Sequence, residues 1–282
     1  MTIIKNIGRL CPTNENGTIQ NDSSHASVPP EFRALIEDVI EKYIIHLETN
    51  LHSVYIRGSI PRGVGIYGVS DLDTIAIVRK KVKHLDLSWV EEVEQTLNAQ
   101  YECVNGVEFS FYYIEDILAA STFSIIPFML KTHSICVAGA DVRPMLPDYK
   151  ADRTLGNEHL VNLATHIERA KEDLDGNEDP VDIMDCCTWI MKIIVRAGLA
   201  LVIEKEHRYT RDLYPAYQLF SNHYPEKSAA MRQAVMYAIQ PIENPHEITS
   251  FLYNMGHWMI HEAEKWLQIY NPKKDLHMKL LK

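Results

Sequence analysis

Two aspartates at the start of an apolar run are the residues of this sequence best suited to chemistry. Asp71 and Asp73 open the segment 71–78, which reads DLDTIAIV. Side chains two residues apart in an extended strand point to the same face, so both carboxylates share a face with Ile75 and Ile77. Adjacent carboxylates repel each other unless a cation lies between them, and Mg²⁺ binds through one or two carboxylates together with substrate phosphates. The pair therefore indicates a metal site at the end of a strand.

A Gly-Ser turn precedes this pair and supplies groups that bind phosphate. Gly58 and Ser59 follow the apolar residues 54–56, and the glycine-containing loop 60–70 connects them to Asp71. Glycine lets the backbone approach a ligand closely, and N–H groups exposed in a glycine turn form a cradle for phosphate. Either feature alone is common at solvated strand ends. Their combination is far more specific and predicts a metal–phosphate site.

This combination resembles the signature of the polymerase-β-type nucleotidyltransferase superfamily, in which G-S, a loop and a strand-borne D-x-D pair follow one another. Thr74 departs from the signature, which has an apolar residue there. In that superfamily a third carboxylate lies on a following strand. Glu108, flanked by apolar residues in the strand-like run 107–112, matches its place.

The resemblance implies a role for each matched residue. Asp71, Asp73 and Glu108 would hold one or two Mg²⁺ ions, with ATP as co-substrate. Glu108 would also act as general base on an acceptor hydroxyl. The Gly-Ser turn, Ser59 and Arg62 would bind the distal phosphates of the nucleotide.

Length and composition restrict the class of protein. The 282 residues fit two modest domains better than one, and 46% hydrophobic with 23% charged residues is ordinary for a globular protein. No apolar run approaches the roughly 20 residues that a membrane span needs, and no secretory signal begins the chain, so we expect no membrane partner. Five cysteines without a C-x-x-C pair indicate reduced thiols and a cytoplasmic protein.

The net charge of −10 bears on the substrate. The notable basic cluster is the RKKVK run that begins at Arg79, whereas a long nucleic acid normally requires a broad basic surface. The acidic balance argues against a long polynucleotide and is compatible with a cationic small molecule. Solubility alone also explains many acidic proteins.

Periodicity divides the chain. Residues 1–30 are polar and indicate an N-terminal arm, and strands and helices then alternate to about residue 115. Helical stripes follow from residue 160 onward, including a long one that begins after Asp179. We expect an α+β protein with a mixed-sheet nucleotidyltransferase domain over 31–150, followed by an all-helical bundle over 151–282.

The helical half is similar to that of aminoglycoside adenylyltransferases that act on streptomycin and spectinomycin. The segment 196–212 resembles that family's helix, basic turn and next helix, which places Arg196 and Arg211 at the nucleotide. The turn is about two residues longer here, so Arg208 can take the place of Arg211. A role in salt bridges at the surface or between helices explains the presence of Arg196 and Arg211 equally well.

Acidic residues near the start of the long helix offer a site for a cationic acceptor. Asp182 and Asp185 are three residues apart and so share a helix face, suited to amino or guanidino groups. Carboxylates at a helix N-terminus are also favoured by the helix dipole, without any ligand. Two histidines, His159 and His166, share a face of the preceding helix, where a core or surface position is the simpler interpretation.

The sequence therefore predicts a Mg²⁺-dependent nucleotidyltransferase that transfers AMP from ATP to a hydroxyl of a small cationic acceptor, such as an aminoglycoside, in antibiotic resistance. Two rivals stay open. One is an enzyme that attaches AMP to a protein, including the antitoxin type, and the other is a non-catalytic nucleotide-binding protein. The sequence does not specify the acceptor, the choice between ATP and other nucleoside triphosphates, or the oligomeric state.

Overall fold

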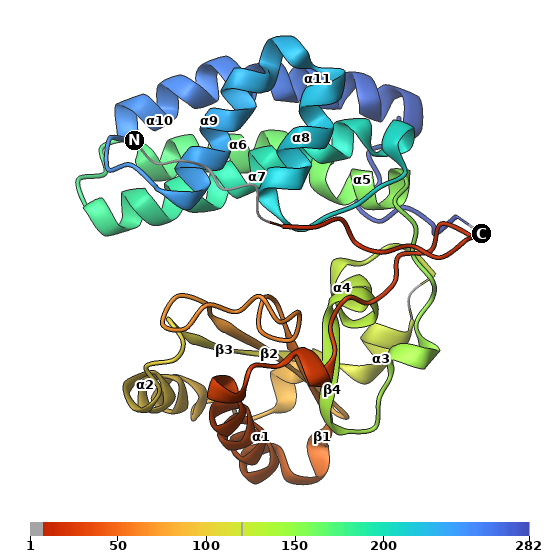
Figure 1. The fold of residues 1–282 in the computed structure, drawn as a ribbon, viewed down its shortest axis with the longest axis vertical. Helices are drawn as coiled ribbons and strands as arrows, with labels where there is room; N and C mark the ends of the chain where they lie inside the picture. The colour runs from red at the N-terminus through yellow and green to blue at the C-terminus, as the bar shows by residue number, and fades with distance from the viewer. Residues whose placement is uncertain (1–7, 120, 282) are drawn as a thin grey trace. The chain divides into compact units, whose positions relative to one another are not determined.

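The protein is described by a computed structural model that covers residues 8–119 and 121–281. The chain forms two compact units (Figure 1). The sheet unit comprises residues 20–149, and the helical unit comprises residues 150–281 together with residues 8–19. The predicted N-terminal arm is thus divided between the units, and its residues 1–7 lie outside the described part. The fold is α+β, as the sequence predicts.

The sheet unit is built on a four-stranded mixed sheet with the order β3-β2-β1-β4. Strand β1 is antiparallel to both β2 and β4, whereas β2 and β3 are parallel. The strands are β1 (Leu51–Arg57), β2 (Leu72–Val78), β3 (Val107–Tyr113) and β4 (Ser134–Gly139), and the α-helices are α1 (Arg33–Leu47), α2 (Val90–Gln100), α3 (Ile114–Leu118) and α4 (Ile125–His133).

Helices cover both faces of this sheet, and the alternation of β2 decides which residues meet them (Figure 1). One face packs against α1 and α2 through residues such as Leu72 and Ala76. The other packs against α3 and α4 through Ile75 and Ile77. Because side chains alternate along a strand, Asp73 lies on the α3–α4 face, at the end where the apolar cluster stops.

Thr74, the departure from the superfamily signature, points to the opposite face and is buried. Its hydroxyl is 2.7 Å from the Tyr43 hydroxyl on α1 and donates to the main-chain oxygen of Glu108, also at 2.7 Å. Burial raises the pKa of Tyr43 well above its usual range. A hydroxyl at position 74 therefore satisfies a buried phenol, and it ties the two strands that carry Asp73 and Glu108 to one helix.

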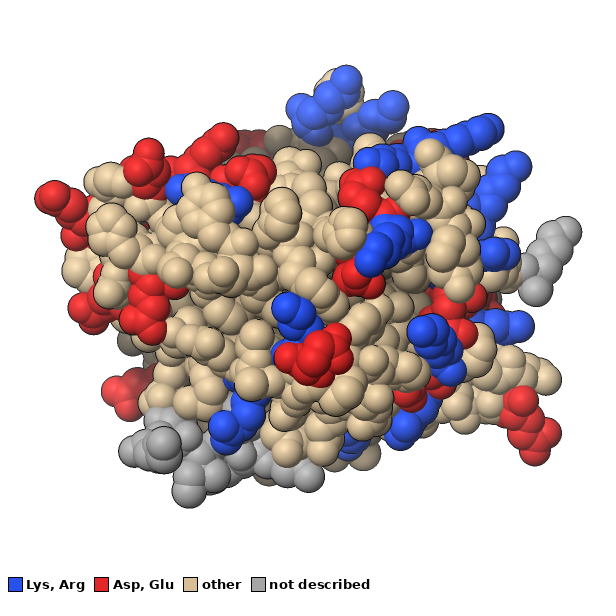
Figure 2. All heavy atoms as spheres, turned by 90° about the horizontal axis from the view of Figure 1, so that it is seen from above, with Lys and Arg blue, Asp and Glu red and all other residues tan. Residues whose placement is uncertain are grey.

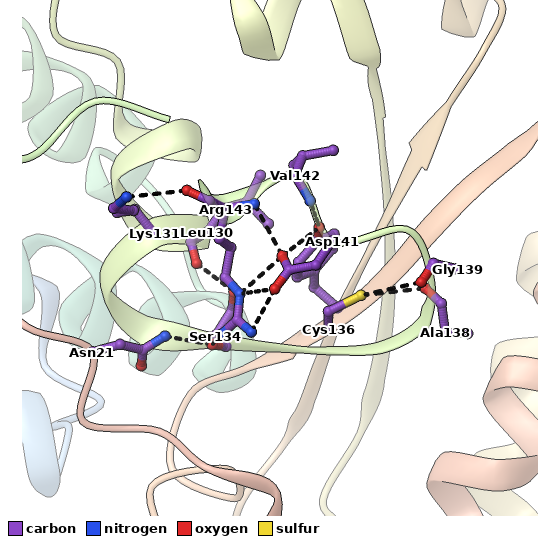
Figure 3. Close-up of polar contacts among 11 residues, drawn as sticks. Asn21, Leu130, Lys131, Ser134, Cys136, Ala138, Gly139, Asp141, Val142 and Arg143 are labelled. Atoms are coloured by element: carbon purple, nitrogen blue, oxygen red, sulfur yellow. Dashed lines mark hydrogen bonds and ion pairs between the residues drawn. The ribbon is translucent and has the colours of Figure 1, made fainter. Parts of the chain in front are cut away.

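The edge strand β4 is held by a polar cluster around Asp141 (Figure 3). The hydroxyl of Tyr55 on β1 donates to Asp141 Oδ1 at 3.2 Å and accepts from the main-chain N–H of Val142 at 2.7 Å. Arg143 pairs with Asp141 at 2.8 Å and donates to the main-chain oxygen of Ser134 at 2.8 Å. These bonds fix the turn after β4 beside the central strand.

The helical unit is organised around α7 (Pro180–Glu206), which contacts the helices around it. Its neighbours are α5 (Arg153–Leu160), α6 (Leu163–Leu174), α8 (Leu213–His223), α9 (Ser228–Ile239) and α11 (His257–Tyr270), with α10 (Pro245–Phe251) and a π-helical turn (Leu252–Gly256) leading into α11. The approach of α9 is close, since a Cβ added to Gly198 would lie 2.4 Å from Met231 Cε.

The expectation that no apolar run approaches the roughly 20 residues of a membrane span is wrong for α7. An 18-residue window of this helix has a mean hydropathy of 1.9, and by length and composition it passes the test for a span. However, 67% of that window is buried inside the structure, as in the core helix of a bundle. Burial on several sides explains why the helix is apolar around most of its circumference.

We predict that Thr74→Val destabilises the sheet unit by roughly 1–3 kcal/mol, because it leaves the buried Tyr43 hydroxyl without this partner. Thr74→Ser keeps the hydroxyl and serves as the matched control, with a smaller loss. Urea unfolding followed by circular dichroism measures both. Equal stability of Thr74→Val and the wild type would contradict the role assigned to this hydroxyl.

Candidate nucleotide and metal site

The Gly-Ser turn lies directly against the carboxylate of Asp73. Gly58 follows the last residue of β1 and has a φ of +93°, in the region that favours glycine. A Cβ at this position would lie 2.9 Å from Asp73 Oδ2. Both the backbone conformation and the space beside Asp73 therefore require glycine here.

Ser59 closes the loop that leads to the aspartates. Its hydroxyl donates to the Ser70 hydroxyl at 3.0 Å, and Ser70 Oγ accepts from the main-chain N–H of Ile66 at 2.9 Å. The main-chain oxygen of Ser59 also accepts from the N–H of Val64 at 3.1 Å. The Ser59 hydroxyl, which is predicted to bind phosphate, thus lies where the two ends of the loop meet. It is next to Gly58 in sequence and is bonded to Ser70, the residue before Asp71.

Asp73 and Glu108 lie side by side. Strands β2 and β3 run parallel with these two residues paired in register, so both side chains leave the same end of the same face. The side chain of Glu108 is 58% exposed and that of Asp73 is 23% exposed. A ligand approaching from solvent therefore meets Glu108 first and Asp73 deeper.

Arg57 supplies the cation that two neighbouring carboxylates require. It is the last residue of β1 and lies opposite Asp73 in the antiparallel register. Its Nη2 is 3.1 Å from Asp73 Oδ1 and 4.0 Å from Glu108 Oε2. The sequence analysis missed Arg57, although its position directly before Gly58, at the end of a paired strand, was a usable signal.

Asp71 is placed differently from the other two carboxylates. It precedes the first residue of β2 and is exposed. Its Oδ1 accepts from Asn105 Nδ2 at 3.3 Å. Within residues 8–119 and 121–281, no group of three or more His, Cys, Asp or Glu side chains is gathered closely enough to form a metal site. The structure thus pairs Asp73 with Glu108 in register, while Asp71 lies just before the strand.

The donor set nevertheless fits a divalent metal. Hard oxygen ligands from one or two carboxylates are the usual protein contribution to a Mg²⁺ site, with phosphate and water completing the shell. Asp73 and Glu108 already share a cationic group, the Arg57 guanidinium. This pair therefore provides the negative charge that a metal needs.

Ser110 is a second residue that the sequence analysis missed. Its hydroxyl donates to Glu108 Oε1 at 3.0 Å. It follows Glu108 by two residues on β3, so strand alternation places both on one face. Ser110 restricts the orientation of the Glu108 carboxylate and leaves Oε2 toward Arg57.

Arg62, expected at the phosphates, has a side chain that is only 8% exposed. Its Nε pairs with Asp22 Oδ2 at 2.7 Å, and His133 Nδ1 is 3.8 Å from the other oxygen of Asp22. Burial alone would raise the pKa of Asp22, but the neighbouring His133 imidazole and Arg62 guanidinium hold this pKa well below its usual range. At this position Arg62 anchors the loop after Ser59 to the start of the sheet unit.

In the helical unit, Arg196 on α7 and Arg211 before α8 act on the same imidazole, that of His159 on α5. Burial first, and then the positive charges of these two arginines, lower the pKa of His159 to about 3. The Nε2 atom of His159 is buried and has no hydrogen-bond partner among the residues that the structure describes. Arg208, the alternative to Arg211, is 53% exposed and lies 3.8 Å from Glu206.

Asp182 and Asp185 line a cavity of about 470 Å³ in the helical unit. Asp173 and Trp189 line it too, so carboxylates and an aromatic face meet there. Stabilisation by the helix dipole, without any ligand, applies best to Asp179. This residue caps α7 by accepting a hydrogen bond from the main-chain N–H at position 181. Figure 2 shows Asp and Glu gathered at the left end of the face that it displays, and Lys and Arg toward the opposite end.

Comparisons with known proteins add little to these observations. No protein-family model and no curated protein matches the chain. One similar solved structure is that of spectinomycin adenyltransferase AAD(9) from Enterococcus faecialis with ATP and spectinomycin. It is 16% identical, covers 82% of this chain and 98% of its own, and has a TM-score of 0.46. A likeness this low carries no argument about the site, which rests on the residues of this chain.

We predict that His159 makes the protein less stable in acid. The folded state takes up a proton at His159 only near pH 3, whereas the unfolded chain does so near its usual pKa of about 6.5. The unfolded state therefore binds more protons in this window, and the free energy of unfolding falls as pH falls from about 6.5 toward 3.

Urea unfolding of His159→Gln as a function of pH measures this contribution. We expect the variant to lose stability less steeply than the wild type over that range. His261→Gln, which changes an exposed histidine of the same unit, is the control and should keep the wild-type slope. A slope unchanged by His159→Gln would contradict the prediction.

Proposed function

We propose that this protein is a Mg²⁺-dependent nucleotidyltransferase that transfers AMP from ATP to a hydroxyl of a small cationic acceptor and releases pyrophosphate. The observation that carries the proposal is the pairing of Asp73 with Glu108 at the end of adjacent strands, beside a Gly58 turn that leaves no room for a side chain. A metal bound there would bridge the phosphates and neutralise the charge that develops during phosphoryl transfer.

Each residue of the sheet unit then has a separate task. Asp73, deeper and adjacent to the turn, and Asp71, at the strand entrance, are the proposed metal ligands. Gly58 and Ser59 bring main-chain N–H groups and a hydroxyl to the phosphates. Arg62 supports this turn through Asp22.

Glu108 is the proposed general base and a further ligand. Its exposed side chain is accessible to an acceptor hydroxyl, and the Ser110 hydroxyl orients its Oε1. A carboxylate in this position can remove the proton of the attacking hydroxyl. Such general-base assistance typically contributes about 10²–10⁴-fold to the rate.

The helical unit itself carries charged groups of the kinds that the two proposed substrates would bind. Arg196 and Arg211 are positive groups that converge on His159, and we propose that they bind the anionic nucleotide. The cavity lined by Asp182 and Asp185 is suited to amino groups of the acceptor, because these two exposed carboxylates attract cations. An aminoglycoside has this chemistry. Arg169 also lines the cavity, where its guanidinium lies 5.8 Å from the centre of the Trp189 ring and its Nε lies 3.6 Å from Asp173 Oδ2.

The experiment that tests the proposal incubates the protein with labelled ATP, Mg²⁺ and a panel of aminoglycosides. AMP on a drug supports the proposed acceptor class. AMP on protein instead favours the protein-modifying rival, and ATP binding without any transfer favours a non-catalytic nucleotide-binding protein. Absence of ATP binding would contradict the nucleotidyltransferase proposal as a whole.

We predict that Glu108→Gln retains ATP binding but lowers turnover by about 10²-fold or more, because the amide cannot accept the proton. Ser110→Ala is the matched control; it removes only the orienting hydroxyl, so its loss should be smaller. Equilibrium ATP binding and single-turnover rates measure the two effects separately. A near-normal rate for Glu108→Gln would remove this residue from the role of base.

We predict that Asp182→Asn and Asp185→Asn raise the KM for a cationic acceptor by about tenfold each, while the KM for ATP stays unchanged. The expected effect corresponds to loss of one charge-assisted contact, about 1.4 kcal/mol. Glu178→Gln removes an exposed charge from the same α6–α7 connection without lining this cavity, and serves as control. A rise in KM equal to that of the control would contradict an acceptor site in this cavity.

A further inference from the structure

The guanidinium of Arg57 faces the two carboxylates, Asp73 and Glu108, that a shared metal ion would bind. Its Nη2 is 3.1 Å from Asp73 Oδ1 and 4.0 Å from Glu108 Oε2. One cationic group therefore faces both carboxylates. The side chain of Arg57 is 17% exposed, so water screens this interaction less than it screens a surface ion pair.

The backbone fixes this placement. Arg57 is paired with Asp73 across the antiparallel β1–β2 ladder, and Asp73 is paired with Glu108 across the parallel β2–β3 ladder. The three side chains are thus consecutive across one row of the sheet, on one face. Gly58 lies directly beside Asp73, since a Cβ added to this glycine would be 2.9 Å from Asp73 Oδ2.

Two cations cannot occupy this position together. A divalent ion bound to Asp73 and Glu108 would lie within a few ångströms of the guanidinium and would be repelled by it. Arginine carries its charge at every relevant pH, so deprotonation cannot relieve the repulsion. The side chain must therefore move away before a metal binds to both carboxylates.

We propose that Arg57 is a built-in counter-ion that competes with the divalent metal for Asp73 and Glu108. The inference rests on the proposed function, because it takes these carboxylates as metal ligands. Its consequence is that a free metal ion binds weakly, whereas an ion that arrives with the triphosphate brings negative charge with it and displaces the guanidinium more readily. Metal and nucleotide then bind with positive coupling, and Arg57 is the source of part of that coupling.

Binding of Mn²⁺, measured by electron paramagnetic resonance without nucleotide, tests the competition. We expect Arg57→Gln to bind Mn²⁺ at least about threefold more tightly than the wild type, since the competing ion pair is removed. Arg57→Lys keeps a positive charge and should remain near the wild type. Arg79→Gln removes the same charge from the far end of β2, where the arginine is exposed, and should have no effect.

The variant Asp73→Asn separates failure of this inference from failure of the proposed function. Equal Mn²⁺ affinity of the wild type and Arg57→Gln, lost in Asp73→Asn, overturns the competition but leaves the metal site in place. Absence of Mn²⁺ binding in both the wild type and Arg57→Gln overturns the metal site together with the competition.

A second measurement uses the unaltered protein and so does not depend on how well Arg57→Gln folds. The side-chain Nε–H resonance of Arg57, assigned by its disappearance in Arg57→Lys, is followed by nuclear magnetic resonance while Mg²⁺ is added. We expect it to shift with the same concentration dependence as metal binding. A resonance that stays fixed while the metal binds overturns the proposal.

Discussion

The carboxylate of Asp73 has to be accommodated at the end of a buried strand, and much of the sheet unit follows from that constraint. Inside the protein a lone negative charge is costly unless other groups compensate it. Here Arg57 supplies the charge, and Gly58 supplies the space that any other residue would fill. The need for glycine at position 58 therefore comes from the Asp73 carboxylate as much as from any bound phosphate.

The same unit contains a second arginine–carboxylate pair that is arranged for a different purpose. Arg62 and Asp22 are almost completely buried and are joined by His133, so breaking this set would leave a charge inside the protein. Arg57 and its two carboxylates lie at a partly exposed edge, and Glu108 is open to solvent. The buried set holds the loop after Ser59 in place, whereas the edge set includes a carboxylate that is accessible to a ligand.

The sequence analysis succeeded where a short-range rule determined the result. Alternation in β2 places Asp73 on the face of Ile75 and Ile77, and the apolar run around Glu108 forms the adjacent strand. The α+β class was predictable from the change from alternating elements to helices alone.

Residues that depend on strand pairing were beyond the same rules. The contact of Arg57 with Asp73 follows from the register of β1 against β2. The position of Arg57 directly before Gly58 indicates the end of a strand but does not identify this partner. Thr74 departed from the signature for a reason visible only in three dimensions, because its partner is Tyr43 on α1. The hydropathy of α7 could be read from its residues, whereas its burial among several helices, which distinguishes a core helix from a membrane span, is visible only in the structure.

The long helix α7 also determines how the two proposed sites of the helical unit relate to each other. Asp185 and Arg196 both belong to it, 11 residues apart in sequence (196 − 185), which at about 1.5 Å per residue corresponds to roughly 16 Å along the helix. Because both residues belong to one continuous helix that packs against its neighbours in the bundle, this spacing is rigid. One functional group of a ligand cannot contact both ends, so an acidic wall near the start of α7 and an arginine further along it suit different substrates. That separation is what an enzyme needs if it binds a cationic acceptor and an anionic nucleotide at once.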